Sequence, residues 1–168
     1  GPDLEPLAVQ LLENWLATSR WEEVRRRVER KSEGPFVLQL AAGRSLVGRF
    51  DLLYRDAAGG WHVLDYKTDR IEGPAADRVE ANYKLQQEAY GLAMSRLLGG
   101  EVVEGVFTFL RTGAEVVWRP TSSAVAEAEG HLARVVASWD SAIGAQVFSK
   151  TEQVRHCIRC GYRVLCGR

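Results

Sequence analysis

The spacing of apolar residues changes from helical to strand-like and back along this chain. Apolar residues recurring every three to four positions predict four helices, over residues 4–18, 21–30, 78–98 and 122–143. A period of two predicts five strands, over residues 36–41, 46–54, 61–66, 102–110 and 115–119. This order predicts an α/β fold in which a central mixed β-sheet is flanked by helices.

Length and composition are those of one globular domain. The chain has 168 residues, of which 46% are hydrophobic and 26% charged. Gly1 and Pro2 resemble the remnant of a cleaved tag, so residues 3–168 are expected to form a single domain, with 145–168 as a cysteine-bearing tail. No apolar run approaches the ~20 residues of a membrane helix, so no membrane partner is expected. Equal numbers of basic and acidic residues, 22 each, exclude a uniformly basic surface.

Two carboxylates are expected to face each other in the hairpin formed by residues 46–66. The loop Asp56–Gly60 joins its strands, and a turn centred on Ala58 pairs residues whose numbers sum to 116, which include Asp51 and Asp65. Directly opposed carboxylates repel each other. Hard oxygen ligands of this kind favour Mg²⁺ or Mn²⁺, so the pair predicts a site for a divalent metal.

Lys67 follows Asp65 by two positions and is therefore expected on the same face of the strand. An ammonium group beside a metal can orient a bound water or stabilise negative charge that develops on a phosphate. These three side chains together indicate phosphodiester hydrolysis. An ordinary charged surface hairpin is the alternative that spacing alone leaves open.

Four short motifs resemble those of RecB-type nucleases in the PD-(D/E)XK superfamily. Gly48-Arg49-Phe50-Asp51 resembles the G-x-x-D motif, and Asp65-Tyr66-Lys67-Thr68 resembles D-Y-K-T. Gln86-Gln87-Glu88-Ala89-Tyr90 resembles Q-x-x-x-Y, and Glu33-Gly34-Pro35-Phe36 resembles E-x-P-F. They occur in the family's order, which implies a restriction-endonuclease-like core of the type found at the C-terminus of AddAB- and RecB-like helicase–nucleases.

The resemblance implies a role for each matching residue. Asp51, Asp65 and the main-chain carbonyl of Tyr66 would bind Mg²⁺ or Mn²⁺, and Lys67 would be the catalytic lysine. The remaining candidates are Gln86 and Tyr90, which share one helix face and would line the cleft or contact DNA, and Glu33, which would support the site. The alternatives are helix-to-sheet packing by Tyr90, a solvated Gln86 and a surface position for Glu33.

One element of the family is missing. RecB-type nucleases usually carry a metal-binding histidine on a helix before the first strand, and His62, His131 and His156 do not fit that place. We therefore expect that the chain starts after this helix in a longer protein, with helicase domains in the same chain or a partner subunit. An incomplete metal shell would impair the activity of the isolated chain.

Three cysteines lie close together near the C-terminus. Cys157, Cys160 and Cys166 resemble the C-terminal cysteine triplet of AddB-like iron–sulfur nucleases, which implies a [4Fe-4S] cluster whose fourth cysteine this sequence lacks. An incomplete cluster is therefore expected here, while zinc and free thiols remain open. The interleaved basic residues are candidate DNA contacts: Arg155, Arg159 and Arg163.

The sequence as a whole predicts a Mg²⁺- or Mn²⁺-dependent deoxyribonuclease. Its expected substrate is single-stranded or unwound DNA, and its expected setting is a recombination and repair helicase–nuclease in a bacterial-type, reducing cytoplasm. The alternative is a catalytically weak or inactive nuclease-fold module that binds or guides DNA or docks a partner.

Overall fold

A computed structural model describes residues 4–40, 43–98, 102–147, 157–158, 160–161 and 163. In this part of the chain the strands are β1 (Arg30–Gln39), β2 (Ser45–Arg55), β3 (Trp61–Lys67), β4 (Val102–Phe109) and β5 (Ala114–Trp118). The helices are α1 (Glu5–Leu16), α2 (Ser19–Val24), α3 (Ala75–Asn82), α4 (Lys84–Leu97) and α5 (Ser122–Ala145).

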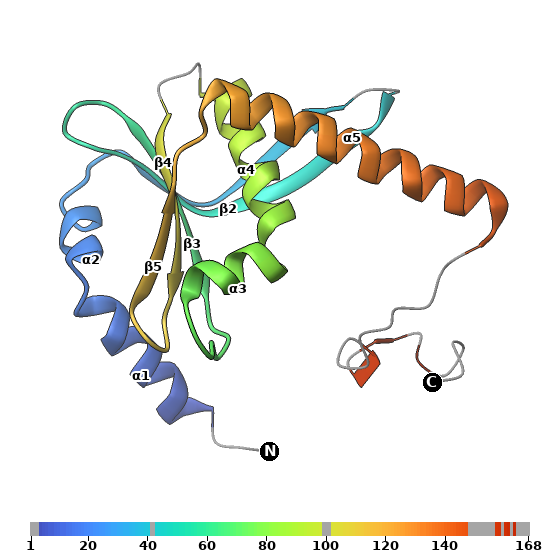
Figure 1. Cartoon of the computed structure of the whole chain (residues 1–168). Coiled ribbons are helices and arrows are strands. Elements are labelled where there is room, and N and C mark those ends of the chain that lie inside the picture. The colour runs from blue at the N-terminus through green and yellow to red at the C-terminus, as the bar shows by residue number, and fades with distance from the viewer. Residues whose placement is uncertain are drawn as a thin grey trace. The chain divides into compact units, whose positions relative to one another are not determined.

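The strands form one mixed sheet in the order β1-β2-β3-β4-β5, with β3 and β4 parallel and the other neighbours antiparallel. Parallel neighbours need a crossover, and α3 and α4 supply it between β3 and β4 (Figure 1). The predicted α/β fold with a mixed sheet flanked by helices is confirmed.

Two neighbouring elements, the helix expected over 21–30 and the strand expected over 36–41, have clearly different bounds. The helix expected over 21–30 ends at Val24, and β1 begins at Arg30 rather than at Phe36, because residues 30–32 pair with β2. Gly34 and Pro35 lie inside β1 instead of ending a helix. β1 is an edge strand, where proline is tolerated because its missing N–H costs no ladder hydrogen bond.

The long helix expected over 78–98 is two helices. α3 and α4 meet at Tyr83, whose φ of −123° and ψ of 4° are not helical. The Tyr83 ring contacts Phe107 and Phe109 of β4, with ring centroids 5.8 and 6.3 Å apart. The change of direction at Tyr83 sets the path of α4 along the sheet.

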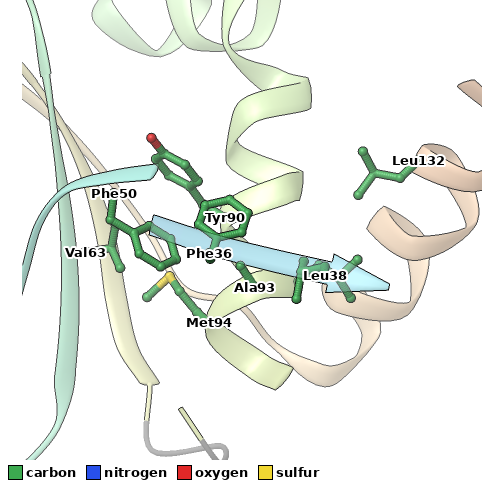
Figure 2. Close-up of a cluster of buried hydrophobic side chains, with 9 residues drawn as sticks. Phe36, Leu38, Phe50, Val63, Tyr90, Ala93, Met94 and Leu132 are labelled. Atoms are coloured by element: carbon green, nitrogen blue, oxygen red, sulfur yellow. The ribbon is translucent and has the colours of Figure 1, made fainter. Parts of the chain in front are cut away.

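Hydrophobic clusters lie on both faces of the sheet, and a third cluster joins Val79 of α3 to Phe107 and Phe109 of β4. On one face, α4 and the first half of α5 cover residues of β1, β2 and β3; this core contains Phe36, Phe50, Val63, Met94 and Leu132 (Figure 2). On the other face, Trp15 of α1 and Val24 of α2 pack against Tyr54 and Leu64. β3 is covered on both faces, so its buried residues include the polar side chains of His62, Asp65 and Lys67 as well as Val63 and Leu64.

The alternation of side chains in β2 is interrupted at Asp51. Phe50 and Leu53 both pack against the α4 core, although strict alternation would place them on opposite faces. Across the ladder, the pairs Ser32–Leu52 and Gly34–Phe50 flank Glu33, whose φ is +53°. Such a backbone is uncommon outside glycine and accompanies irregular strand pairing. Asp51 therefore sits at a local irregularity of the sheet.

The chain divides into two compact units, up to Ala133 and from Arg134 onward. The sheet, α1 to α4 and the first half of α5 belong to the first unit. The second unit holds the rest of α5 and the described tail residues. Within the described part of the chain, none of the helices is both long and apolar enough to cross a membrane.

Candidate active site

β2, the carboxyl end of β3 and the first half of α4 bring five of the predicted residues together: Asp51, Asp65, Lys67, Gln86 and Tyr90. The expected hairpin register is confirmed up to Leu52–Leu64, the ladder pair next to Asp51 and Asp65. Asp65 and Lys67 point toward α4, where Gln86 and Tyr90 are separated by one helical turn.

Asp65 is the centre of this cluster. Its side chain is nearly fully buried, and its Oδ1 accepts a hydrogen bond from Nε2 of Gln86 at 2.7 Å and lies 2.8 Å from the Tyr90 hydroxyl. The Lys67 ammonium approaches Oδ2 at 2.5 Å. This is a close ion pair without hydrogen-bond alignment, so the buried Oδ2 has no aligned donor among the described residues. A buried carboxylate oxygen in this state can accept a further cation.

The side chain of Asp51 is half-buried, and its ionised form is electrostatically unfavourable. Its Oδ2 accepts a hydrogen bond from the main-chain N–H of Tyr66 at 2.9 Å. Burial, followed by the negative charges of Asp65 and Glu33, raises the pKa of Asp51, and the Tyr66 N–H and Lys67 only partly oppose this rise. A positive charge at this position would relieve both the desolvation and the repulsion.

Lys67 is fixed from three directions. Its Nζ donates to Oε1 of Gln86 at 2.7 Å and pairs with Asp65. It also lies 4.2 Å from the ring centroid of Tyr83 and 5.1 Å from that of Phe107. These aromatic faces attract the ammonium without neutralising it. Lys67 is therefore a buried, oriented positive charge beside two carboxylates.

Tyr90 closes the cluster from the core side. Its hydroxyl lies 2.8 Å from the Arg49 carbonyl and 2.8 Å from Oδ1 of Asp65, and it accepts a hydrogen bond from Gln86. Burial, with the charge of Asp65 next, raises the pKa of Tyr90, which keeps the hydroxyl protonated as a donor. The Tyr90 ring packs against Phe36 and Phe50 (Figure 2). Tyr90 therefore packs α4 against the sheet through its ring and contacts Asp65 through its hydroxyl, so both kinds of contact are present.

The other two candidates are peripheral to these contacts. Glu33 is exposed, pairs with Arg49 at 3.1 Å and acts on Asp51 through its charge. Tyr66 donates its main-chain N–H to Asp51, and its ring packs against Trp15 on the opposite face. The proposed use of the Tyr66 carbonyl as a metal ligand stays a prediction.

Sequence reasoning missed the support beneath Lys67. The Tyr83 hydroxyl donates to Oδ1 of Asp69 at 2.7 Å, and Arg78 pairs with Oδ2 at 2.8 Å. Burial and then the Asp69 contact raise the pKa of Tyr83 to about 12, so the ring under Lys67 stays neutral. The signal was present in the sequence, since Asp69 lies two residues after Lys67 and Tyr83 three before Gln86.

The described histidines lie outside the cluster. Nε2 of His62 lies 2.9 Å from Oδ2 of Asp56, and Nδ1 of His131 lies 2.7 Å from Oε2 of Glu88. Among the described residues, no group of three or more His, Cys, Asp or Glu side chains gathers closely enough to hold a metal ion. The binding of a divalent cation by Asp51 and Asp65 stays a prediction, and so small a ligand set would suit a cation that keeps several waters.

The structure describes only part of the cysteine tail. Cys157 and Cys160 form no disulfide there, and the Cys160 N–H donates to the Cys157 carbonyl at 3.2 Å. The Arg163 N–H donates to the Cys160 carbonyl at 3.1 Å. The other predicted tail residues lie outside the described residues: Cys166, Arg155, Arg159 and His156. The predicted cluster and the tail DNA contacts are not tested.

Comparison with known proteins agrees with this geometry. The model of the PD-(D/E)XK nuclease superfamily matches residues 4–167, so the chain belongs to that superfamily. The crystal structure of SSO0001 is similar to this chain, with a TM-score of 0.57. The similarity covers 97% of this chain and 78% of the SSO0001 chain. Its sequence identity is 16%, so the likeness concerns the fold. None of the curated proteins matches this chain.

Proposed function

We propose that this chain is a DNA nuclease dependent on Mg²⁺ or Mn²⁺. The observation that carries the proposal is the state of the two carboxylates. Asp65 is buried with its charge balanced by Lys67, and the neighbouring half-buried Asp51 has a raised pKa, so the two carboxylates carry more negative charge than the one ammonium offsets. A divalent cation between them would satisfy both, and Lys67 stands 2.5 Å from the same Asp65 oxygen.

Each residue would contribute a separate action. Asp51, Asp65 and the Tyr66 carbonyl would hold the metal, which when bound polarises a phosphate and makes a water more acidic. Lys67 would place its charge where negative charge develops on the phosphate. Gln86 orients Lys67 through its Oε1 and Asp65 through its Nε2. Tyr90 keeps Asp65 in place by hydrogen bonding.

We further propose that the nuclease is of the RecB type and cuts single-stranded or unwound DNA during recombination and repair. The support is the order of the four motifs and membership of the superfamily. In this proposal helicase domains, in the same chain or in a partner subunit, deliver the strand. The proposed compartment is a reducing cytoplasm.

The cysteine triplet is proposed to bind an iron–sulfur cluster, on the strength of its spacing alone. Iron, sulfide and zinc contents of the purified protein test this, with Cys160→Ala as the comparison. Iron and sulfide in equal amounts that fall in the variant would support a cluster. Zinc in the same experiment would assign the site to zinc instead, and neither metal would indicate free thiols.

Cleavage of end-labelled single-stranded DNA in Mg²⁺ and in Mn²⁺ tests the proposed activity. We expect cleavage by the wild-type protein, loss with EDTA or Asp65→Ala, and a fall of about 10²–10³ with Lys67→Met. Asp77→Ala, which removes an exposed carboxylate from α3, is the matched control and should cleave normally. Equal cleavage by wild-type protein and Asp65→Ala would contradict the assignment.

A second candidate is a nuclease-fold module that binds DNA without cutting it. The ion pair between Lys67 and Asp65 favours this candidate, because it already neutralises one carboxylate without a metal. Titration with Mn²⁺ separates the two functions. Binding that disappears in Asp65→Ala supports the nuclease, whereas DNA binding with no metal binding supports the non-cutting module.

A further inference from the structure

A hollow of about 290 Å³ opens beside the carboxyl end of β3, where the chain leaves the sheet after Lys67. Three segments line it, and the six residues are Gln10, Leu11, Arg70, Ile71, Arg111 and Thr112. The two charged residues among them are both arginines. Its volume is near the lower end of typical ligand pockets, which suits a phosphate with its attached sugar.

One nitrogen of the Arg111 guanidinium is hydrogen-bonded to the main chain, and its other two nitrogens are available to a ligand. Its Nε donates to the main-chain carbonyl of Thr68 at 2.6 Å. Within the described residues, its two terminal nitrogens form no hydrogen bond or ion pair. A guanidinium anchored in this way loses little conformational freedom when it binds an anion, and its fork geometry matches phosphate oxygens.

Arg70 has no hydrogen-bond or ion-pair partner among the described residues, and it is exposed. The neighbouring carboxylate of Asp69 does not compensate it, because that group is already bonded to Arg78 and Tyr83. Two arginines that line one hollow with no carboxylate among its lining residues create a positive potential, which favours binding of an anion there.

Main-chain hydrogen bonds connect the turn that lines the hollow to the strand that carries Lys67. The Leu110 N–H donates to the Lys67 carbonyl at 2.9 Å, and Asn14 of α1 donates to the Leu110 carbonyl at 2.8 Å. The turn that carries Arg111 is therefore tied both to α1 and to the strand that carries Lys67. Arg70 follows Lys67 by three residues, so their Cα atoms are at most about 11 Å apart.

We propose that Arg70 and Arg111 form a subsite for one phosphate of a DNA strand, about one to three nucleotides from the phosphate that is cut. The choice of DNA as the ligand rests on the proposed nuclease function. The subsite has no base-reading groups, so it positions the strand without selecting its sequence. Its two arginines are not among the tail arginines predicted from the sequence.

Binding of a fluorescent single-stranded oligonucleotide in EDTA tests the subsite without any cleavage. We expect Arg70→Ala and Arg111→Ala each to raise Kd about threefold to tenfold at 50 mM salt, and to lower the slope of log K against log salt by about 0.7. Arg119→Ala is the control, because Arg119 is also exposed, pairs loosely with Glu104 at 3.6 Å and follows β5, at the opposite end of the sheet. It should leave both quantities unchanged.

Arg70→Ala keeps the test independent of folding, because Arg70 has no partner to lose among the described residues, and equal unfolding midpoints check this. An unchanged Kd and slope in Arg70→Ala, or no binding by the wild-type protein, would overturn the proposal. Weakened binding by both variants without metal-dependent cleavage by the wild-type protein would support the subsite and reject the nuclease. Cleavage with unchanged binding would do the reverse.

Discussion

At the scale of single residues, Asp51 connects the electrostatics of the site to a measurable stability. Its pKa is raised from the ordinary 3.8, first by burial and then by the charge of Asp65. An acid with a raised pKa in the folded state favours folding while it is protonated, and this contribution is lost as pH rises through that pKa. At neutral pH the ionised Asp51 therefore destabilises the metal-free protein.

We predict that Asp51→Asn raises the thermal unfolding midpoint at neutral pH in EDTA, by an amount on the order of one or two degrees. The asparagine removes the charge while its side-chain oxygen can still accept from the Tyr66 N–H. The difference should vanish well below pH 3.8, where Asp51 is protonated in both the folded and the unfolded state. A lower midpoint at neutral pH would contradict this account.

The same variant should lose the stabilisation that metal provides. Mn²⁺ at a hundred times its Kd stabilises a binding protein by about 2.7 kcal/mol, and Asp51→Asn should show little of this gain. Asp77→Asn, on the exposed face of α3, is the control and should respond to Mn²⁺ as the wild-type protein does. Differential scanning calorimetry with and without Mn²⁺ gives both comparisons.

At the scale of elements, two of the family-like motifs meet as a packing pair. Phe36 of β1 lies opposite Gly48 of β2, and the Phe36 ring covers the position where a Cβ on Gly48 would stand. The same ring packs against Tyr90, which bonds to Asp65. The glycine of G-x-x-D and the phenylalanine of E-x-P-F therefore form one contact that supports the site from below.

We predict that Gly48→Ala destabilises the protein by about 1–3 kcal/mol, because the added methyl group displaces the Phe36 ring from the core. Gly91→Ala is the matched control. Its Cβ would lie 3.6 Å from Trp118 and Pro120, an ordinary contact, and alanine favours the interior of α4. Urea unfolding of both variants checks the prediction, and equal stability of the two would disprove it.

At the scale of the whole first unit, Arg20 joins segments that are far apart in the sequence. From α2 it pairs with Glu104 of β4 at 2.8 Å and with Glu115 of β5 at 3.1 Å, and it donates to the Tyr54 hydroxyl at 3.2 Å. Burial lowers the pKa of Arg20, but these contacts together raise that pKa by a larger amount, so the guanidinium stays charged. The N-terminal helices are thereby attached to the sheet by a partly buried cation as well as by apolar packing.

We predict that Arg20→Met lowers the free energy of unfolding by about 3 kcal/mol or more. The reason is that the buried carboxylate of Glu104 loses its closest cation. Arg26→Met removes a mostly exposed arginine paired with Glu22 and should cost less than about 1 kcal/mol. Denaturant unfolding at neutral pH measures both. Similar losses in the two variants would show that the buried network is not a major source of stability.

The local sequence pattern determined most of the secondary structure and part of the candidate site. Turn chemistry around Ala58 and a period of two predicted the hairpin register that sets Asp51 near Asp65, and helical spacing predicted that Gln86 and Tyr90 share a face. These predictions succeed because they depend on contacts within a turn or between neighbouring strands.

Only the tertiary structure decided the rest, because those contacts join segments whose separation in sequence carries no periodic signal. Pairing with β2 extended β1 through Pro35, and packing on β4 divided the predicted long helix at Tyr83. The fold alone placed Gln86 against Lys67, and it brought Arg111 beside Arg70. The sequence thus determined which groups are candidates for the chemistry, and long-range packing determined how they are oriented, since packing free energy depends on the whole sheet rather than on any one segment.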